Sequence, residues 1–188
     1  MTERNLPNCE DGFRKGVAMD VAIWAERHNA RPGLRFFLRH LALRPGFYFA
    51  FGHRCVRLVR RVPVLGAIIG RFLTAFLELA FSSEIAVSAQ FGGGLYVPHP
   101  FGIVIGDKCK IGRNVTILQN VTFGNRSLTS PAQPYVEDDA YIGAGAVVLG
   151  EIAVGNGAMV GANAVVLSDV PPQRVAVGNP ARLAPPRQ

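Results

Sequence analysis

The chain has 188 residues, 49% of them hydrophobic and 18% charged, with a formal net charge of +7. This balance excludes a disordered chain and allows one domain with a smaller appendage. Three cysteines without a CxxC pair argue against a disulfide framework or a zinc site, and an acidic start without an early apolar run argues against a signal peptide. We therefore expect a cytoplasmic protein.

The positive charge lies mainly in the first half of the chain. Residues 1–84 contain 13 lysines and arginines against 7 acidic residues, whereas residues 85–188 contain 7 against 6. Either an anionic neighbour (a membrane surface, a nucleic acid or an acidic partner) or an ordinary solvated helix face explains this excess. The second half lacks the basic-aromatic motifs of nucleic-acid binders, so we expect no nucleic-acid partner.

Residues 1–82 predict an N-terminal helical region of three or four short helices. Apolar residues recur at helical spacing over 11–29, 34–44, 47–61 and 64–81. The breaks between these segments are Pro32-Gly33, Pro45-Gly46 and Val62-Pro63. Such helices, apolar on one side and arginine-rich on the other, pack on one another, on a second subunit or on a membrane surface. Oligomerisation and peripheral membrane association both stay open.

Residues 62–81 form the most apolar of these segments, and they are about long enough to span a bilayer. Arg71 at the middle and Glu78 near the end are costly in hydrocarbon, so we expect a packed or interfacial helix. Three histidines are scattered among the predicted helices, and we interpret them as structural or surface residues: His28, His40 and His53.

From Ile85 onward, an aliphatic or aromatic residue recurs every six positions. The three series are Ile85, Phe91, Val97 and Ile103, then Ile105, Ile111, Ile117 and Phe123, then Val136, Ile142, Val148, Val154, Val160 and Val166. A period of six is typical of a parallel β-helix, in which each hexapeptide forms one flat face and three faces form a coil. Glycine, asparagine and aspartate at the turns permit positive φ. We therefore predict a mainly β fold, with a β-helix over 83–178 and a C-terminal tail over 179–188.

The repeat slips at two places. A two-residue insertion surrounds His99, the only histidine of the C-terminal half. Thirteen residues separate Phe123 from Val136, which leaves a polar, protruding loop over 124–135. Loops on rigid scaffolds commonly carry function. We expect the chemistry of the protein at these two slips.

Several stretches of the repeat resemble the hexapeptide-repeat acyltransferases, which have a left-handed β-helix, and in particular the serine acetyltransferase branch. The matching stretches are His-Pro-Phe-Gly-Ile-Val-Ile-Gly at 99–106, Ile-Leu-Gln-Asn-Val-Thr at 117–122, Ile-Gly-Ala-Gly-Ala at 142–146, Val-Pro-Pro at 170–172 and Gly-Asn-Pro-Ala-Arg at 178–182. The pattern looks most like the serine-acetyltransferase-like enzymes of polysaccharide gene clusters.

The resemblance implies acetyl transfer from acetyl-CoA to a hydroxyl, with His99 as the catalytic base. An alcohol needs such a base to remove its proton as it attacks a thioester. Glu84, 15 residues before His99, stands near the place of the carboxylate that orients the histidine in this family. It would fix the imidazole tautomer and stabilise the imidazolium that forms. The proton then passes to the departing thiolate.

The resemblance also implies a slot for acetyl-CoA along the stacked coils. Gly124, Ala144, Ala162 and Gly178 would line this slot, and Arg182 is one of the cations near its phosphates. Small side chains let an extended pantetheine arm approach the backbone. We expect no metal, because a zinc enzyme on this fold needs several histidines and the repeat has only His99.

Two departures from the family pattern concern the acceptor. Where the family holds serine with Arg-His-Pro, this chain has Ala-Gln-Pro at 132–134, and where it has an acid before a proline, this chain has Arg44. A sugar or glycan precursor is therefore our main interpretation of the acceptor, with Gln133, Pro100 and Phe101 as its contacts. Serine O-acetylation in cysteine biosynthesis is the alternative, and a non-catalytic scaffold is a remote one.

The family assembles as trimers, with active sites between neighbouring subunits. By this resemblance we expect a homotrimer, or a hexamer if the N-terminal helices pair two trimers.

Overall fold

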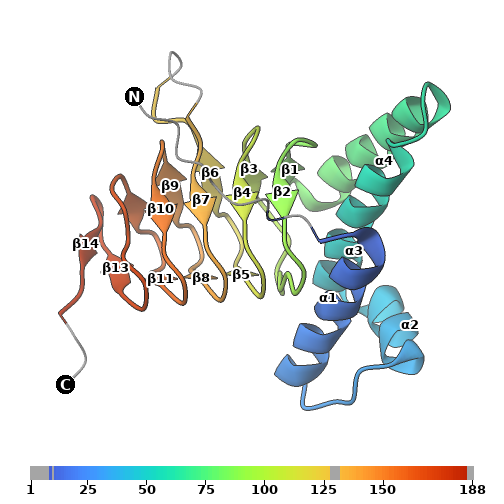
Figure 1. The fold of residues 1–188 in the computed structure, drawn as a ribbon, viewed down its shortest axis with the longest axis horizontal. Coiled ribbons are helices and arrows are strands. Elements are labelled where there is room, and N and C mark those ends of the chain that lie inside the picture. Colours follow the sequence, from blue (N-terminus) through green and yellow to red (C-terminus); the bar gives the residue numbers. More distant parts are fainter. Residues whose placement is uncertain (1–8, 10, 128–131, 186–188) are drawn as a thin grey trace.

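The computed structural model describes residues 9, 11–127 and 132–185, and it shows a helical part followed by a β-helix (Figure 1). Part of the predicted loop at 124–135 and the end of the predicted tail at 179–188 lie outside the described residues. The helices are α1 (Phe13–Arg27), α2 (Leu34–Leu43), α3 (Pro45–Val59) and α4 (Leu65–Phe81).

The four helices occupy the segments that the apolar spacing predicts, with one difference at Pro45. This proline begins α3 instead of separating two helices, because a missing N–H and a fixed φ suit the first helical position. In the described part of the chain, no helix combines the length and the hydropathy needed to cross a membrane. Peripheral membrane association stays a prediction.

Short strands form three parallel sheets, which we name faces A, B and C after their order along each coil. Face A is β1 (Glu84–Ile85), β3 (Val104–Ile105), β6 (Thr122–Gly124), β9 (Val147–Leu149) and β12 (Val165–Val166). Face B is β2 (Gln90–Phe91), β4 (Lys110–Ile111), β7 (Tyr135–Val136) and β10 (Ala153–Val154). Face C is β5 (Thr116–Ile117), β8 (Tyr141–Ile142), β11 (Met159–Val160), β13 (Val175–Val177) and β14 (Arg182–Leu183), of which β14 pairs antiparallel with β13.

The residues of the six-residue series stack inside the prism, coil above coil. On face A, the strand register places Ile85, Ile105, Phe123, Val148 and Val166 in one column. Each of these side chains is at most 4% exposed. Burying an aliphatic side chain contributes about 1.5–3 kcal/mol, so the recurrence of such residues holds the coils together.

The corners of the prism need left-handed backbone at particular residues. Asn114, Asn120, Asp139 and Asn163 all have φ between 55° and 61° at turns between strands. Asparagine and aspartate adopt this conformation at a lower cost than other non-glycine residues. The predicted role of these residue types at the turns is therefore confirmed.

The helices close the first coil through a buried ion pair. Asp20 of α1 is 4% exposed and accepts hydrogen bonds from Arg54 of α3 and from the Leu95 N–H, at 2.8 Å each. Arg54 also donates to the Gly92 carbonyl, at 2.8 Å. Nearby, the Trp24 indole donates to the Leu95 carbonyl, at 3.2 Å. One charged pair thus joins α1, α3 and the start of the β-helix.

Replacing Asp20 with leucine should lower the free energy of unfolding by about 3–5 kcal/mol, because Arg54 keeps a charge that is almost buried and no longer paired. Urea denaturation followed by circular dichroism measures this loss. The double variant Asp20→Leu/Arg54→Met removes both charges and should be more stable than the single variant. A double variant as unstable as the single one would show that the unpaired charge is not the cause.

Candidate active site

His99 lies in the loop that joins face C to face A in the first coil. Before it, Tyr96 forms a bridge with Thr116 of face C, and after it the chain enters β3 of face A. The side chain of His99 is exposed. The insertion in the repeat therefore holds an imidazole at a corner of the prism, which we name corner CA.

Ser83 fixes the loop on which His99 lies. Its hydroxyl donates to the Pro100 carbonyl at 2.8 Å and accepts from the Ile103 N–H at 3.0 Å, and the side chain is only 3% exposed. Gly102 has a φ of +67°, and a Cβ there would overlap the Asn120 side chain. Contacts of Ser83 and Gly102 on the inner side of the loop thus hold both ends of the insertion. The side chain of His99 points outward. The sequence reasoning missed Ser83, since only its place next to Glu84 could have indicated it.

Glu84 begins β1 and is exposed on face A, at the start of the coil that His99 ends. Its neighbour Ser83 binds the loop of His99, so the two segments are adjacent. Within the described residues, the Glu84 carboxylate and the His99 ring each have no hydrogen bond or ion pair with any side chain. The expected pairing of Glu84 with His99 stays a prediction.

Three of the four small residues expected to line the acetyl-CoA slot lie on corner CA. Ala144 follows β8 and Ala162 follows β11, each on the way from face C to face A. Gly178 follows β13, from which the chain turns back into β14 of face C. Backbone hydrogen bonds join successive coils along corner CA. The Asn163 N–H donates to the Ala144 carbonyl at 2.8 Å, and the Val165 N–H donates to the Gly178 carbonyl at 2.9 Å. The three small residues form a column that continues from His99 toward the C-terminal coils.

Gly124 and Gln133 lie on the other edge of face A, at the corner toward face B. Gly124 ends β6, and Gln133 precedes β7 at the end of the protruding loop. The Gln133 side chain accepts a hydrogen bond from the Cys109 thiol at 3.2 Å and donates to Asn125. The structure therefore does not bring these two residues to His99 within one chain.

The remaining predicted residues differ in their exposure. Phe101 is 48% exposed beside His99, whereas Pro100 is buried and presents its carbonyl to Ser83. Phe101, and not the Pro100 ring, is thus available to an acceptor. Arg182 is exposed in β14, at the end of the column. Gln119, which the sequence pattern does not single out, lies on corner CA one coil beyond His99. Its buried Oε1 has no hydrogen-bond partner in the described chain.

The other three histidines are engaged within the helices, as predicted. The Nδ1 of His28 lies 2.8 Å from the Trp24 carbonyl, and that of His40 lies 3.0 Å from the Phe36 carbonyl. His53 packs edge-on against Phe49, and burial lowers its pKa to about 4. His99 is the exposed histidine at corner CA, whereas His28 and His40 lie at a separate cavity beside α2.

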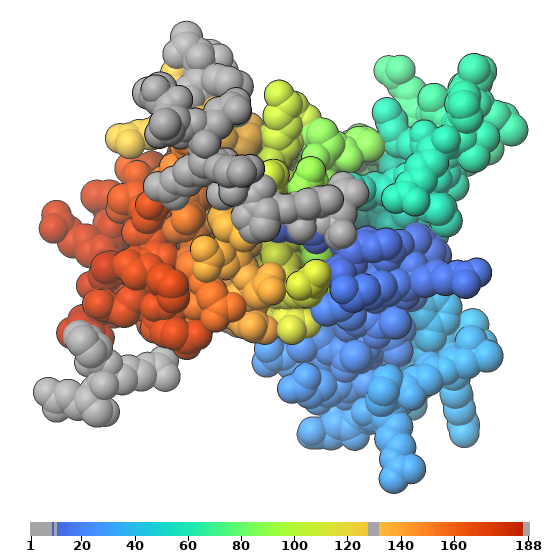
Figure 2. Space-filling model, in the orientation of Figure 1, coloured from blue at the N-terminus to red at the C-terminus, as the bar shows by residue number. Residues whose placement is uncertain are grey.

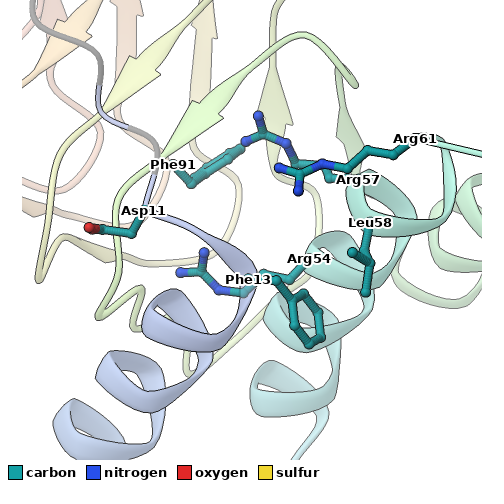
Figure 3. Close-up of a pocket in the computed structure, with 7 residues that line it drawn as sticks. All are labelled: Asp11, Phe13, Arg54, Arg57, Leu58, Arg61 and Phe91. Atoms are coloured by element: carbon teal, nitrogen blue, oxygen red, sulfur yellow. The ribbon is translucent and has the colours of Figure 1, made fainter.

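A small basic pocket lies between the helices and face B, on another side of the first coil. Figure 3 shows Arg57 of α3 and Arg61 of the turn after it reaching toward Phe91, with Asp11 and Arg54 nearby. Phe91 belongs to face B, whereas His99 lies between faces C and A. This pocket is therefore separate from the corner that carries His99. No group of three histidine, cysteine or acidic side chains suited to a metal occurs within 11–127 and 132–185 or at residue 9.

Known proteins share this arrangement. A family model described as bacterial transferase hexapeptide (six repeats) matches residues 134–168, and one described as hexapeptide repeat of succinyl-transferase matches residues 91–119. A serine acetyltransferase from Bacillus licheniformis is 37% identical over 177 residues, which cover 91% of this chain and 77% of that protein. The chain belongs to the serine acetyltransferase family.

Other members of the serine acetyltransferase family are longer than this chain. The match to the Bacillus subtilis enzyme covers 62% of that protein, and the match to the Salmonella typhimurium enzyme covers 41%. Among solved structures, soybean serine acetyltransferase complexed with serine superposes with a TM-score of 0.79 at 35% identity, covering 93% of this chain and 70% of that one. The Neisseria gonorrhoeae enzyme in complex with serine gives 0.79 at 32% identity, covering 92% and 69%.

Membership in this family confirms three predictions. The fold is a left-handed parallel β-helix with N-terminal helices, the resemblance to hexapeptide-repeat acyltransferases of the serine acetyltransferase branch is correct, and the protein is an acyltransferase. Closeness to the polysaccharide-cluster enzymes stays a prediction.

The buried side chain of His53 should make the stability of the protein depend on pH. Its pKa falls from 6.5 to about 4 on burial, so the unfolded chain takes up a proton more readily than the folded one. The contribution of His53 to the free energy of unfolding is fully present above pH 6.5 and should fall by up to about 3 kcal/mol as the pH falls to 4. Urea denaturation at pH 7.5 and 4.5 measures the fall.

The control is His53→Gln, which lacks the imidazole and should show a smaller fall. Asp11 stays ionised in this pH range, because the hydrogen bond with Arg113 is the main cause of its lowered pKa. Equal pH dependence in the two proteins would contradict the assignment to His53.

Proposed function

We propose that the protein is an acetyl-CoA-dependent O-acetyltransferase in which His99 is the general base. The observation that carries the proposal is the position of His99: an exposed imidazole in a loop held by Ser83, at the start of the column of small residues on corner CA. Membership in the serine acetyltransferase family supports acetyl-CoA as the acyl donor.

In the proposed reaction, His99 takes the proton of the acceptor hydroxyl as its oxygen attacks the thioester carbonyl of acetyl-CoA. The tetrahedral oxyanion then collapses and breaks the C–S bond. The imidazolium returns its proton to the departing thiolate, which leaves as free CoA, and the acetyl ester of the acceptor remains. Glu84 would orient the imidazole and stabilise its protonated form during the step.

The division of residues between two edges of face A supports a site between subunits. His99, Ala144, Ala162 and Gly178 lie on one edge, and Gly124 and Gln133 lie on the other. In a cyclic trimer the interface is heterologous, so one edge of a subunit meets a different edge of the next. A homotrimer would place the Gln133 edge of one subunit opposite the His99 edge of its neighbour.

Serine is the acceptor that the comparisons favour, since the named relatives are serine acetyltransferases and two of the similar structures are complexes with serine. A sugar hydroxyl is the second candidate, and two residues favour it. Gln133 is a neutral amide held by Cys109 and Asn125, and Arg44 precedes Pro45 where an acid would hold an amino group.

His99→Ala should lower kcat by at least about 100-fold with either acceptor, because a positioned base contributes about 10²–10⁴. Release of free CoA from acetyl-CoA, measured with a thiol reagent, gives the rate with L-serine, monosaccharides, nucleotide sugars and oligosaccharides. His53→Gln, a histidine change away from corner CA, is the matched control. Wild-type turnover by His99→Ala would overturn the mechanism, and a large preference for L-serine would exclude the sugar.

Glu84→Gln should lower kcat by at least about tenfold and leave the KM for acetyl-CoA within about twofold, because an orienting carboxylate acts through the base. Glu84→Asp keeps the charge and should recover most of the activity. An unchanged kcat in Glu84→Gln would show that Glu84 does not act on His99.

A further inference from the structure

A second basic cavity lies beside the first coil, between the end of α1, helix α2 and the turn into α3. Its volume is about 590 Å³. Four arginines and two histidines are prominent in its lining, and we name it the arginine pocket: Arg31, Arg35, Arg39, Arg44, His28 and His40. No acidic side chain lines it. A cavity of this size suits a ligand larger than a single inorganic ion.

The positive charge of the arginine pocket is not balanced within the described residues. None of its four arginines makes an ion pair or a side-chain hydrogen bond there. Arg54 and Arg113, by contrast, are paired with Asp20 and Asp11. The pKa of His40 is lowered, first by burial and then by the nearby charges of its own pocket. Such a site attracts an anion that can accept several guanidinium hydrogen bonds.

The helices that form the arginine pocket contact the segment from which the loop of His99 begins. Arg44 is the residue before α3, and two residues later Gly46 packs so closely on the first coil that a Cβ would overlap the Val97 carbonyl oxygen. On the other side, the His28 ring stacks on Trp24, with ring centroids 5.7 Å apart, and Trp24 contacts Tyr96. Tyr96 and Val97 are the residues from which the loop of His99 begins.

The position of the arginine pocket separates it from the expected acetyl-CoA slot. Helix α2, light blue in Figure 2, lies beside the first coil, at the opposite end of the molecule from the C-terminal coils. The column formed by Ala144, Ala162 and Gly178 runs toward those C-terminal coils. The phosphates of CoA in that slot would lie far from α2, so the pocket is not part of the expected slot for acetyl-CoA.

We propose that the arginine pocket binds a phosphate or diphosphate group of the acceptor, so that the substrate is a phosphorylated sugar whose hydroxyl reaches His99. This inference rests on the proposed O-acetyltransferase function and on its second acceptor. A sugar linked to a nucleoside diphosphate and a sugar linked to a lipid through diphosphate share this chemistry. Guanidinium groups bind phosphate oxygens in pairs, which gives both affinity and orientation.

The first test measures binding directly. Isothermal titration calorimetry with inorganic pyrophosphate should show binding to the wild-type protein, and the Kd should rise at least tenfold in Arg39→Gln and in Arg44→Gln. Arg39→Lys keeps the charge, so its Kd for pyrophosphate should rise less than that of Arg39→Gln. Arg71→Gln, an exposed arginine of α4 outside the pocket, is the matched control and should bind as the wild type does. Circular dichroism verifies the fold of each variant.

The second test measures turnover with matched acceptors: a free sugar, its phosphate, its uridine diphosphate form and its diphosphate on an alkyl chain. The phosphorylated forms should have a kcat/KM at least tenfold above the free sugar, and Arg44→Gln should remove that advantage without changing the KM for acetyl-CoA. The better of the two diphosphates identifies the source, and either supports the proposal.

The outcomes separate this inference from the proposed function. Suppose that the protein acetylates L-serine or the free sugar preferentially and does not bind pyrophosphate. This result would overturn the proposed role of the arginine pocket and leave the proposed O-acetyltransferase activity standing. Binding of pyrophosphate that depends on Arg39 and Arg44, without acetyl transfer to any acceptor, would overturn the proposed function and leave an anion site.

Discussion

The stacking of identical faces is the constraint on which the rest of this molecule depends. Each strand is only two or three residues long and has no stability alone, so it persists because the coils on either side pair with it and bury the same column of aliphatic side chains. A stack of this kind leaves an open end at the first coil. The helices cover that end through Asp20, Arg54 and Trp24, and in doing so they bring the α2–α3 turn beside the loop of His99.

A regular stack also explains why the insertion at His99 is informative. A hexapeptide that keeps the period places its side chains where the neighbouring coils dictate, either in the core or on a flat face. Two extra residues release the chain from that register, and Ser83 and Gly102 then hold the displaced loop in one conformation. A rigid scaffold with one inserted loop in a single conformation suits a catalytic base, because the loop presents the base outward in a fixed position.

The sequence was sufficient for the β-helix, since a six-residue period recurs over its whole length and each period places an apolar side chain inside. It also located both departures from the period, around His99 and at 124–135. It did not reveal Ser83, whose hydroxyl acts through contacts with residues 17 and 20 positions away. It did not reveal the arginine pocket either, because spacing along a helix shows that Arg35 and Arg39 share a face but not that Arg31 and Arg44 converge on them across two turns.

The position of Arg44 links the helical part to the choice of acceptor. The shared fold and the proposed base would require only that acetyl-CoA and a hydroxyl meet at corner CA. Membership in the serine acetyltransferase family is therefore compatible with more than one acceptor. The selecting residues would be those that the acceptor touches away from its reacting hydroxyl. In the proposed site these would be positively charged or neutral, with Arg44 from the helices of one subunit and Gln133 from the loop of a neighbouring subunit. Zwitterionic serine gains little from such a set, because its ammonium group finds no carboxylate among the residues that line the arginine pocket. A phosphorylated sugar, by contrast, presents hydroxyls and anionic oxygens to these residues.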